Sequence, residues 1–259
     1  MANFAVDLVR FASIAHSMQA DDPHAWDRLI LAREDRITVQ WAPFEHTPRT
    51  ARLVIVGITP GRVQAVNALR AFRDELHKGA AIDDALRLAK LVGSFSGPMR
   101  TNIVEMLDCI EVPPALDVQD GAALFNPAYE LVHFTSALRY PVFVDGENYN
   151  GNPDMLRTPL LREMIETFLE AEARLLQDAL WLPLGPKPAI ALRHLVSRGA
   201  LRADHVLEGM PHPSGANAER IKFFLGLKAR TALSQKTRPD LIEAARETLL
   251  AQVRRLRSV

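Results

Sequence analysis

A short, uninterrupted apolar segment is the strongest structural signal in the sequence. Residues 52–58 read RLVIVGI, without the alternation of apolar and polar residues that a half-exposed strand shows. Such a run predicts a strand covered on both faces, as in a parallel sheet. A turn, Thr-Pro-Gly at 59–61, follows it, and the next residues carry an apolar face at helical spacing. This strand–turn–helix is the first half of an α/β unit.

The same alternation of strands and helices continues along the chain. Further strands are predicted at 37–42, 131–138, 180–184 and 205–207, and helices at 82–92, 99–110, 158–180, 187–198 and 215–230. The order predicts an α/β fold, a three-layer α/β/α sandwich with a mostly parallel central sheet. Ligands of such sheets bind beyond the carboxyl ends of the strands, where we expect the loops 59–61, 93–97, 135–140 and 209–215.

The chain shows no internal repeat, low-complexity tract or Ser/Gly linker, so we expect one domain over residues 1–259. Within it, residues 1–36 are predicted to form a helical N-terminal extension, with helices at 3–18 and from 22 to about 36. The core of the fold is expected over 50–228. Residues 239–257 are predicted to form a C-terminal helix.

Composition excludes several classes of protein. Of the 259 residues, 48% are hydrophobic and 24% charged, as in an ordinary globular protein. Lys and Arg total 31, as do Asp and Glu, so no field of one sign covers the whole molecule. Cys109 is the only cysteine, which excludes an internal disulfide, a Cys-based zinc site and an iron–sulfur cluster. We expect no cofactor or metal, no signal peptide or membrane span, and a reducing cytoplasm.

The segment GMPHPSGAN, residues 209–217, is the first candidate site. Two prolines flank His212 and restrict its backbone, which suits an imidazole held rigidly over a substrate. Ser214 is expected to cap the following helix, whose first amides suit a phosphate. From 213 to 238 six basic residues oppose one acidic residue, Glu219, a net charge of +5. This basic stripe is either a phosphate contact or a solvated helix face.

Two further loops carry residues suited to binding. In Gly57-Ile58-Thr59-Pro60-Gly61, Thr59 is expected to cap a helix that begins at Pro60, and the amides there suit an anion or a water. In Gly93-Ser94-Phe95-Ser96-Gly97, an aromatic ring lies between small residues. Phe95 either lies flat against a planar ligand or anchors the loop in the core.

Taken in this order, these motifs resemble those of the uracil-DNA glycosylase superfamily. The GITPG segment is similar to the first motif of the mismatch-specific branch, Gly-Ile-Asn-Pro-Gly, and His212-Pro213-Ser214 to the last motif of the superfamily. Phe95 matches its base-stacking phenylalanine, and Ser136 stands where it carries a strand-end Asn. Residues 181–187 look like its penultimate strand and turn. The resemblance covers about residues 50–228.

The resemblance implies a monomeric, metal-independent enzyme that flips a damaged base, uracil above all, out of DNA and hydrolyses its N-glycosidic bond. A hydrogen bond from an imidazole would stabilise the departing base, and a polar group on the first loop would position water. The roles implied are catalysis for His212 and Thr59, base binding for Phe95, Ser136, Gly57, Ile58 and Pro60, and phosphate binding for Gly61, Ser214, Asn217, Arg220 and Lys222.

Two residues depart from the superfamily pattern. Thr59 replaces Asn or Asp on the first loop, and a hydroxyl is a poor base at neutral pH. Ser136 replaces the Asn that reads the base edge. A carboxylate at Glu45 or Glu147 is therefore a candidate accessory group, with Tyr149 as a stacking residue.

Two other functions stay open at this point. One is a module that binds a nucleic acid, a nucleotide or a base without cleaving it. The other is a small-molecule hydrolase on the same fold that uses Glu45 or Glu147 with His212.

Overall fold

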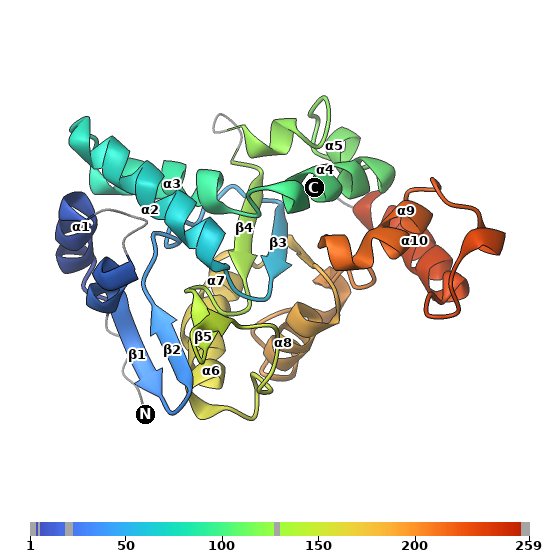
Figure 1. Ribbon diagram of the computed structural model, residues 1–259. Coiled ribbons are helices and arrows are strands. Elements are labelled where there is room, and N and C mark those ends of the chain that lie inside the picture. The colour runs from blue at the N-terminus through green and yellow to red at the C-terminus, as the bar shows by residue number, and fades with distance from the viewer. Residues whose placement is uncertain (1–3, 5, 19–22, 127–129, 255–259) are drawn as a thin grey trace. The chain divides into compact units, whose positions relative to one another are not determined.

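The computed structural model describes residues 4, 6–18, 23–126 and 130–254 (Figure 1). They divide into two compact units, between which the chain passes several times. Unit 1 comprises Met1–Thr47, Gly57–Ser96 and Phe134–Leu175, and unit 2 comprises Pro48–Val56, Gly97–His133 and Leu176–Val259.

A three-stranded sheet runs in the order β4-β3-β7. Its strands are β3 (Leu53–Gly57), β4 (Val132–Ser136) and β7 (Leu180–Pro183). Strands β3 and β7 pair in parallel, with Leu53 opposite Leu180. Strand β4 runs the same way as β3, because their starts are joined by Arg52 N–H to Leu131 O and their ends by Ala137 N–H to Gly57 O. Every residue of β3 is buried, which confirms the strand predicted from the apolar run.

A second, antiparallel sheet was not expected. It consists of β1 (Ile30–Glu34), β2 (Ile37–Gln40), β5 (Val142–Val144) and β6 (Glu147–Asn148), in that order. The predicted helix from 22 to 36 is wrong: a 3-10 helix, η1 (Pro23–Leu29), leads into β1, which forms a hairpin with β2. The hairpin turns at Asp35, whose φ is 48°. Pairing with β2 outweighs the helical spacing of the apolar residues.

The helices of unit 1 largely follow the predictions. They are α1 (Leu8–Ser17), α2 (Arg62–His77), α3 (Ile82–Gly93), α6 (Pro159–Met164), η3 (Ile165–Leu169) and α7 (Glu170–Leu175). Helices α2 and α3 pack side by side (Figure 1). The segment η3 is a π-helix between α6 and α7, so the long helix predicted over 158–180 carries a π-bulge. The core of this unit includes the Trp41 ring, which stacks on Phe11 and meets Phe72 edge-on.

The helices of unit 2 are shorter than predicted near the C-terminus. They are α4 (Pro98–Cys109), α5 (Val112–Ala115), η2 (Ala123–Phe125), α8 (Pro186–Ser197), η4 (Ala203–His205), η5 (Gly215–Asn217), α9 (Ala218–Phe224), η6 (Arg230–Ala232) and α10 (Pro239–Val253). The helix predicted over 215–230 is thus broken into pieces. The strand predicted at 205–207 is a single parallel bridge between Val206 and Trp181.

The structure is therefore a mixed α/β fold with a parallel sheet, as the sequence predicts, and the N-terminal extension is partly β rather than wholly helical. The last residues of the helix predicted over 239–257 lie outside the described part. No helix within that part has the length and apolar character needed to cross a membrane.

A buried ion pair fixes the chain after β4. The Arg139 Nε and Nη2 donate to Glu172 Oε1 at 2.9 and 2.7 Å, and the two side chains are only 14% and 2% exposed. The guanidinium also lies 5.0 Å from the centre of the Phe168 ring. A buried charge that loses its partner is costly, so each side chain needs the other.

We expect Arg139→Met to lower the free energy of unfolding by about 3–5 kcal/mol, because it leaves Glu172 buried and unpaired. Arg139→Met combined with Glu172→Leu should recover most of that loss, since neither charge remains. Urea unfolding of the wild type, both single variants and the pair measures the coupling. Arg202→Met, which breaks the exposed pair with Asp204, is the matched control and should leave the free energy of unfolding close to that of the wild type. A value equally close to the wild type for Arg139→Met would contradict the expectation.

Candidate functional site

A pocket lies in unit 1, where β3 and β4 end. Three of the loops expected at the site, 59–61, 93–97 and 135–140, contribute to its wall. The lining residues are Phe44, Pro60, Gln64, Lys90, Ser94, Phe95, Phe134, Thr135, Ser136 and Arg139.

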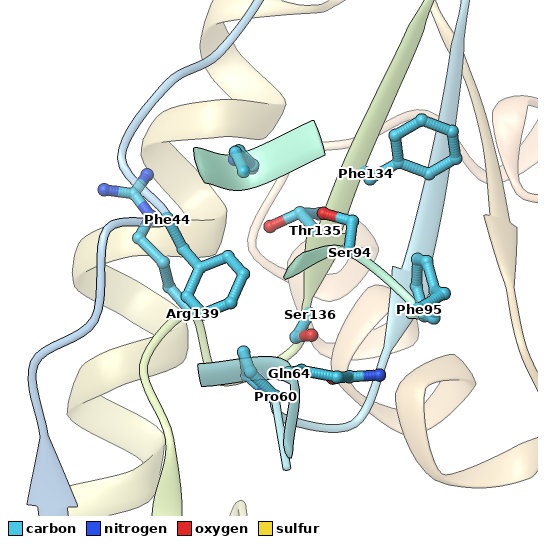
Figure 2. A pocket seen from close by; sticks show the side chains of 10 residues that line it. Phe44, Pro60, Gln64, Ser94, Phe95, Phe134, Thr135, Ser136 and Arg139 are labelled. Atoms are coloured by element: carbon cyan, nitrogen blue, oxygen red, sulfur yellow. The ribbon is translucent and has the colours of Figure 1, made fainter. Parts of the chain in front are cut away.

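Two phenylalanine rings form walls of the pocket. Figure 2 shows Phe44 and Phe95 on opposite sides of the view, with the hydroxyls of Ser94, Thr135 and Ser136 between them. Phe95 has a φ of 51°, a left-handed conformation that is rare for a bulky residue. Its ring meets that of Phe134 edge-on, with the centroids 6.1 Å apart. Strain of this kind concentrates at ligand sites, so both interpretations of Phe95, loop anchor and pocket wall, apply to it.

Gly57 leaves the space that the Phe95 ring occupies. A Cβ atom at Gly57 would lie 3.0 Å from Phe95 Cε1 and 3.3 Å from Ser136 Oγ. The carbonyls of Gly57 and Ile58 accept hydrogen bonds from the amides of Ala137 and Leu138. Gly57 and Ile58 therefore shape the pocket through the backbone, while Pro60 lines it directly.

The polar edge of the pocket carries unused hydrogen-bonding capacity. Thr135 Oγ1 is buried and has no hydrogen-bond partner. Ser136, at the end of β4 as expected, is also buried and lines the pocket. A buried hydroxyl without a partner is costly, so a polar ligand at this edge would be favoured.

Lys90 and Arg139 bring positive charge to the wall, and sequence analysis missed both. Lys90 is only 4% exposed, and its Nζ donates to the carbonyl of His46 at 2.6 Å. Burial lowers the pKa of the Lys90 amine to about 7. Arg139 is engaged by Glu172. Their isolated positions in helical or loop sequence gave no signal for a pocket.

Glu45, an expected accessory residue, lies in a cluster beside the pocket wall. Its Oε1 accepts from Trp41 Nε1 at 2.6 Å and from the Tyr140 hydroxyl at 2.9 Å, while its Oε2 is buried without a hydrogen-bond partner. Burial raises the pKa of the carboxyl, and the two hydrogen bonds oppose that shift only in part. Its neighbour Phe44, rather than Glu45, lines the pocket.

The other accessory candidates are not among the lining residues. Glu147 is exposed in β6, opposite Val144. Tyr149 is buried, and its hydroxyl donates to the carbonyl of Pro153 at 2.5 Å. Neither residue stands at the pocket as proposed from the sequence.

The first loop differs from its predicted geometry. Helix α2 begins at Arg62, with Gly61 rather than Thr59 as its N-cap. The Thr59 hydroxyl instead donates to Tyr140 O at 2.9 Å and accepts from Val142 N–H at 3.2 Å. The Gly61 amide donates to Gln64 Oε1 and the Arg62 amide to Asn148 Oδ1. The side chains of Gln64 and Asn148 thus accept from the amides that were expected to hold an anion or a water.

His212 belongs to unit 2 and is held rigidly there. Its Nδ1 accepts from Ser214 N–H at 3.2 Å, and Asn102 Nδ2 donates to Pro213 O at 2.7 Å. The backbone of His212 also packs against Gly185. Burial lowers the pKa of the imidazole. With Nδ1 as an acceptor, the neutral ring carries its proton on Nε2 and can donate from there.

The expected phosphate contacts of unit 2 are partly used within the protein. Ser214 Oγ accepts from Asn217 Nδ2 rather than capping a helix, and Arg220 donates to Asn217 Oδ1. Lys222 is exposed. Lys228 pairs with Glu219, and Arg230 pairs with Asp240 and Glu243. The basic stripe is therefore weaker than its net charge suggests, because α10 supplies acidic partners.

Across the described ranges, no group of three or more His, Cys, Asp or Glu side chains is placed to hold a metal ion.

We expect Glu45→Gln to stabilise the protein at neutral pH. The folded state raises the pKa of Glu45, so wild-type stability falls as pH rises from the unfolded-state pKa of about 4.3 through the folded value. The amide removes that loss and keeps an oxygen for Trp41 and Tyr140. Urea unfolding at pH 4 and pH 8 measures it: the gain should be present at pH 8 and vanish near pH 4. An equal effect at both values would contradict the expectation.

Comparison with known proteins identifies one relative among curated sequences. No family model matches the chain, and no solved structure matches it. The uncharacterized protein YoxB of Bacillus subtilis (strain 168) is 34% identical over 201 residues, which cover 76% of this chain and 78% of that protein. The chain therefore belongs to the same family as YoxB.

Proposed function

We propose that this chain is a uracil-DNA glycosylase-like protein that acts in the cytoplasm on DNA. It would bind a flipped damaged base, uracil above all, and hydrolyse the N-glycosidic bond. The observation that carries the proposal is Phe95, held in a left-handed conformation in a pocket at the carboxyl ends of β3 and β4. This is the residue for which the sequence motifs imply base stacking.

Two features of the pocket support a pyrimidine as its ligand. Two aromatic rings suit a planar ring, which gains from stacking about 1–3 kcal/mol per base. The Thr135 and Ser136 hydroxyls offer hydrogen-bonding groups to the edge of the base.

His212 has the protonation state that the chemistry needs. When the bond between the base and the sugar breaks, its electrons move to the base and a carbonyl oxygen gains negative charge. In the proposed reaction a hydrogen bond from Nε2–H of a neutral imidazole stabilises that charge. The Nδ1 contact with Ser214 and the lowered pKa both favour this neutral form.

A base-binding protein without catalysis is the second candidate, and Thr59 favours it. Its hydroxyl is engaged by Tyr140 and Val142, so it is poorly placed to activate water. In the catalytic proposal Thr59 is a positioning residue that fixes the first loop, and water attacks the sugar without a base from this residue.

We expect the wild type to release uracil from oligonucleotides with a single uracil, and His212→Ala to do so about 10²–10³-fold more slowly. Gel assays on single- and double-stranded substrates with uracil, hypoxanthine, xanthine or a thymine mismatch measure release. Because burial lowers the pKa of His212, the wild-type rate should persist to a lower pH than the ordinary histidine pKa of about 6.5 would allow.

The control is His16→Ala, which removes an exposed histidine of α1 and should keep wild-type activity. Release by neither wild type nor control on any substrate would exclude the glycosylase. If both then still bound the modified oligonucleotides, the binding module would be supported.

We expect Gly57→Ala to weaken substrate binding at unchanged fold. The added methyl group would press on the Phe95 ring at 3.0 Å and tilt it out of its stacking position. The apparent affinity for uracil-containing oligonucleotides should fall about tenfold, a change of about 1.4 kcal/mol. Fluorescence anisotropy measures it, with Val63→Ala on the exposed face of α2 as the control. Unchanged affinity would mean that the base does not bind in this pocket.

A further inference from the structure

We propose that Lys90 is the nucleophile of an imine-forming site in the unit 1 pocket, which takes a small planar aldehyde. This activity goes beyond base release and does not depend on it. The reaction concerns the Lys90 amine and a carbonyl carbon, and needs neither His212 nor Thr59.

The position of Lys90 in the pocket suits a nucleophile. Lys90 lies in the last turn of α3, close to the start of the Phe95 loop, and lines the pocket. Its Nζ makes one hydrogen bond, to the carbonyl of His46, and no ion pair within 4 Å in the described part of the chain. A backbone carbonyl does not hold the amine in its charged form as a carboxylate would.

The surroundings of Lys90 also suit a nucleophile. Burial is the main cause that lowers the pKa of the amine to about 7, and the charge of Arg139 acts in the same direction. Glu172 and Glu45 oppose the shift, but Glu172 is paired with Arg139, and burial favours the neutral form of Glu45. At pH 7 about half of the Lys90 amines are neutral, against about one in 2,500 for an ordinary lysine.

The chemistry is that of an amine with an aldehyde. The neutral Nζ attacks the carbonyl carbon, a C–N bond forms and the oxygen takes a proton, which gives a carbinolamine. Loss of the second N–H proton and of the hydroxyl releases one water and leaves a C=N bond to the lysine. No electrons are gained or lost, so no oxidant or reductant is required.

The pocket selects the class of carbonyl compound. Phe44 and Phe95 favour a flat ring or conjugated chain. The hydroxyl of Thr135 has no partner and can bond to a polar substituent of the ligand. Two sources offer such a group, a free aromatic aldehyde and the open-chain sugar at an abasic site in DNA.

The test is reductive trapping on the full chain at pH 7. The protein is incubated with 2-hydroxybenzaldehyde and cyanoborohydride, whose hydride converts the imine to a stable secondary amine. Peptide mass spectrometry then measures the adduct at each lysine. The sequence has six, Lys78, Lys90, Lys187, Lys222, Lys228 and Lys236. We expect the adduct at Lys90 to form at least 100-fold faster than at the other five.

A second arm uses a synthetic oligonucleotide with an abasic site, made without this protein. A covalent protein–DNA product at Lys90 would identify DNA as the source of the carbonyl, whereas trapping of the small aldehyde alone would identify a free metabolite. Either result supports the imine site. Because both reagents are supplied ready-made, failure of the glycosylase proposal does not affect the outcome.

Lys90→Met should abolish the fast adduct, and Lys187→Met, which removes an exposed lysine, should leave it unchanged. The peptide map of the wild type decides the question even if Lys90→Met does not fold. Labelling spread evenly over the exposed lysines, with none in excess at Lys90, would overturn the proposal.

Discussion

The ion pair between Arg139 and Glu172 joins the segment after β4 to α7 and thereby fixes one wall of the pocket. Three residues of β4, Phe134, Thr135 and Ser136, line the pocket together with Arg139. Because both charges are withdrawn from water, neither side chain can move to solvent without exposing the other as an unpaired charge. The end of β4 is therefore held in place by electrostatics as well as by its hydrogen bonds to β3.

Burial also shifts the protonation of the ionisable side chains around the pocket, Lys90 and Glu45. Burial favours the neutral amine of Lys90 and the neutral acid of Glu45, two groups that are charged on a protein surface at pH 7. Arg139 and Glu172 remain charged, and their opposite charges cancel. A ligand in this pocket therefore meets hydrogen-bonding groups and less charge than the same side chains would carry on a protein surface.

Local sequence predicted those parts of the site that a short segment determines. The apolar run of β3, the turn after it, Phe95 between small residues and the serine that ends β4 all carry their signal within a few residues. Phe44, Lys90 and Arg139 carry no such signal in the neighbouring sequence. Each reaches the pocket through packing between distant segments, as when the carbonyl of His46 receives the Lys90 amine. Only the conformation of the folded chain shows such a pairing.

The errors have the same origin. Residues 22–36 are predicted to be helical, but β2 offers residues 30–34 a ladder of backbone hydrogen bonds, and strand pairing prevails. Thr59 has the sequence context of a helix cap, yet Tyr140 and Val142, about 80 residues away, engage its hydroxyl. Acidic residues of α10 likewise neutralise part of the basic stripe. In each case a partner distant in sequence outweighs the local preference.

The hydrogen-bonding groups of the first loop, residues 59–61, are largely paired within the protein. The Thr59 hydroxyl and the amides of Gly61 and Arg62 all have acceptors or donors within the protein, so this loop contributes shape through Pro60. Of the side chains that line the pocket, Thr135 has a hydroxyl with no hydrogen-bond partner, and the Lys90 amine has one partner, the carbonyl of His46. Satisfied groups hold the pocket in one conformation, and the unsatisfied ones gain a partner only when a ligand enters. Binding free energy is therefore concentrated on the wall formed by β4 and α3.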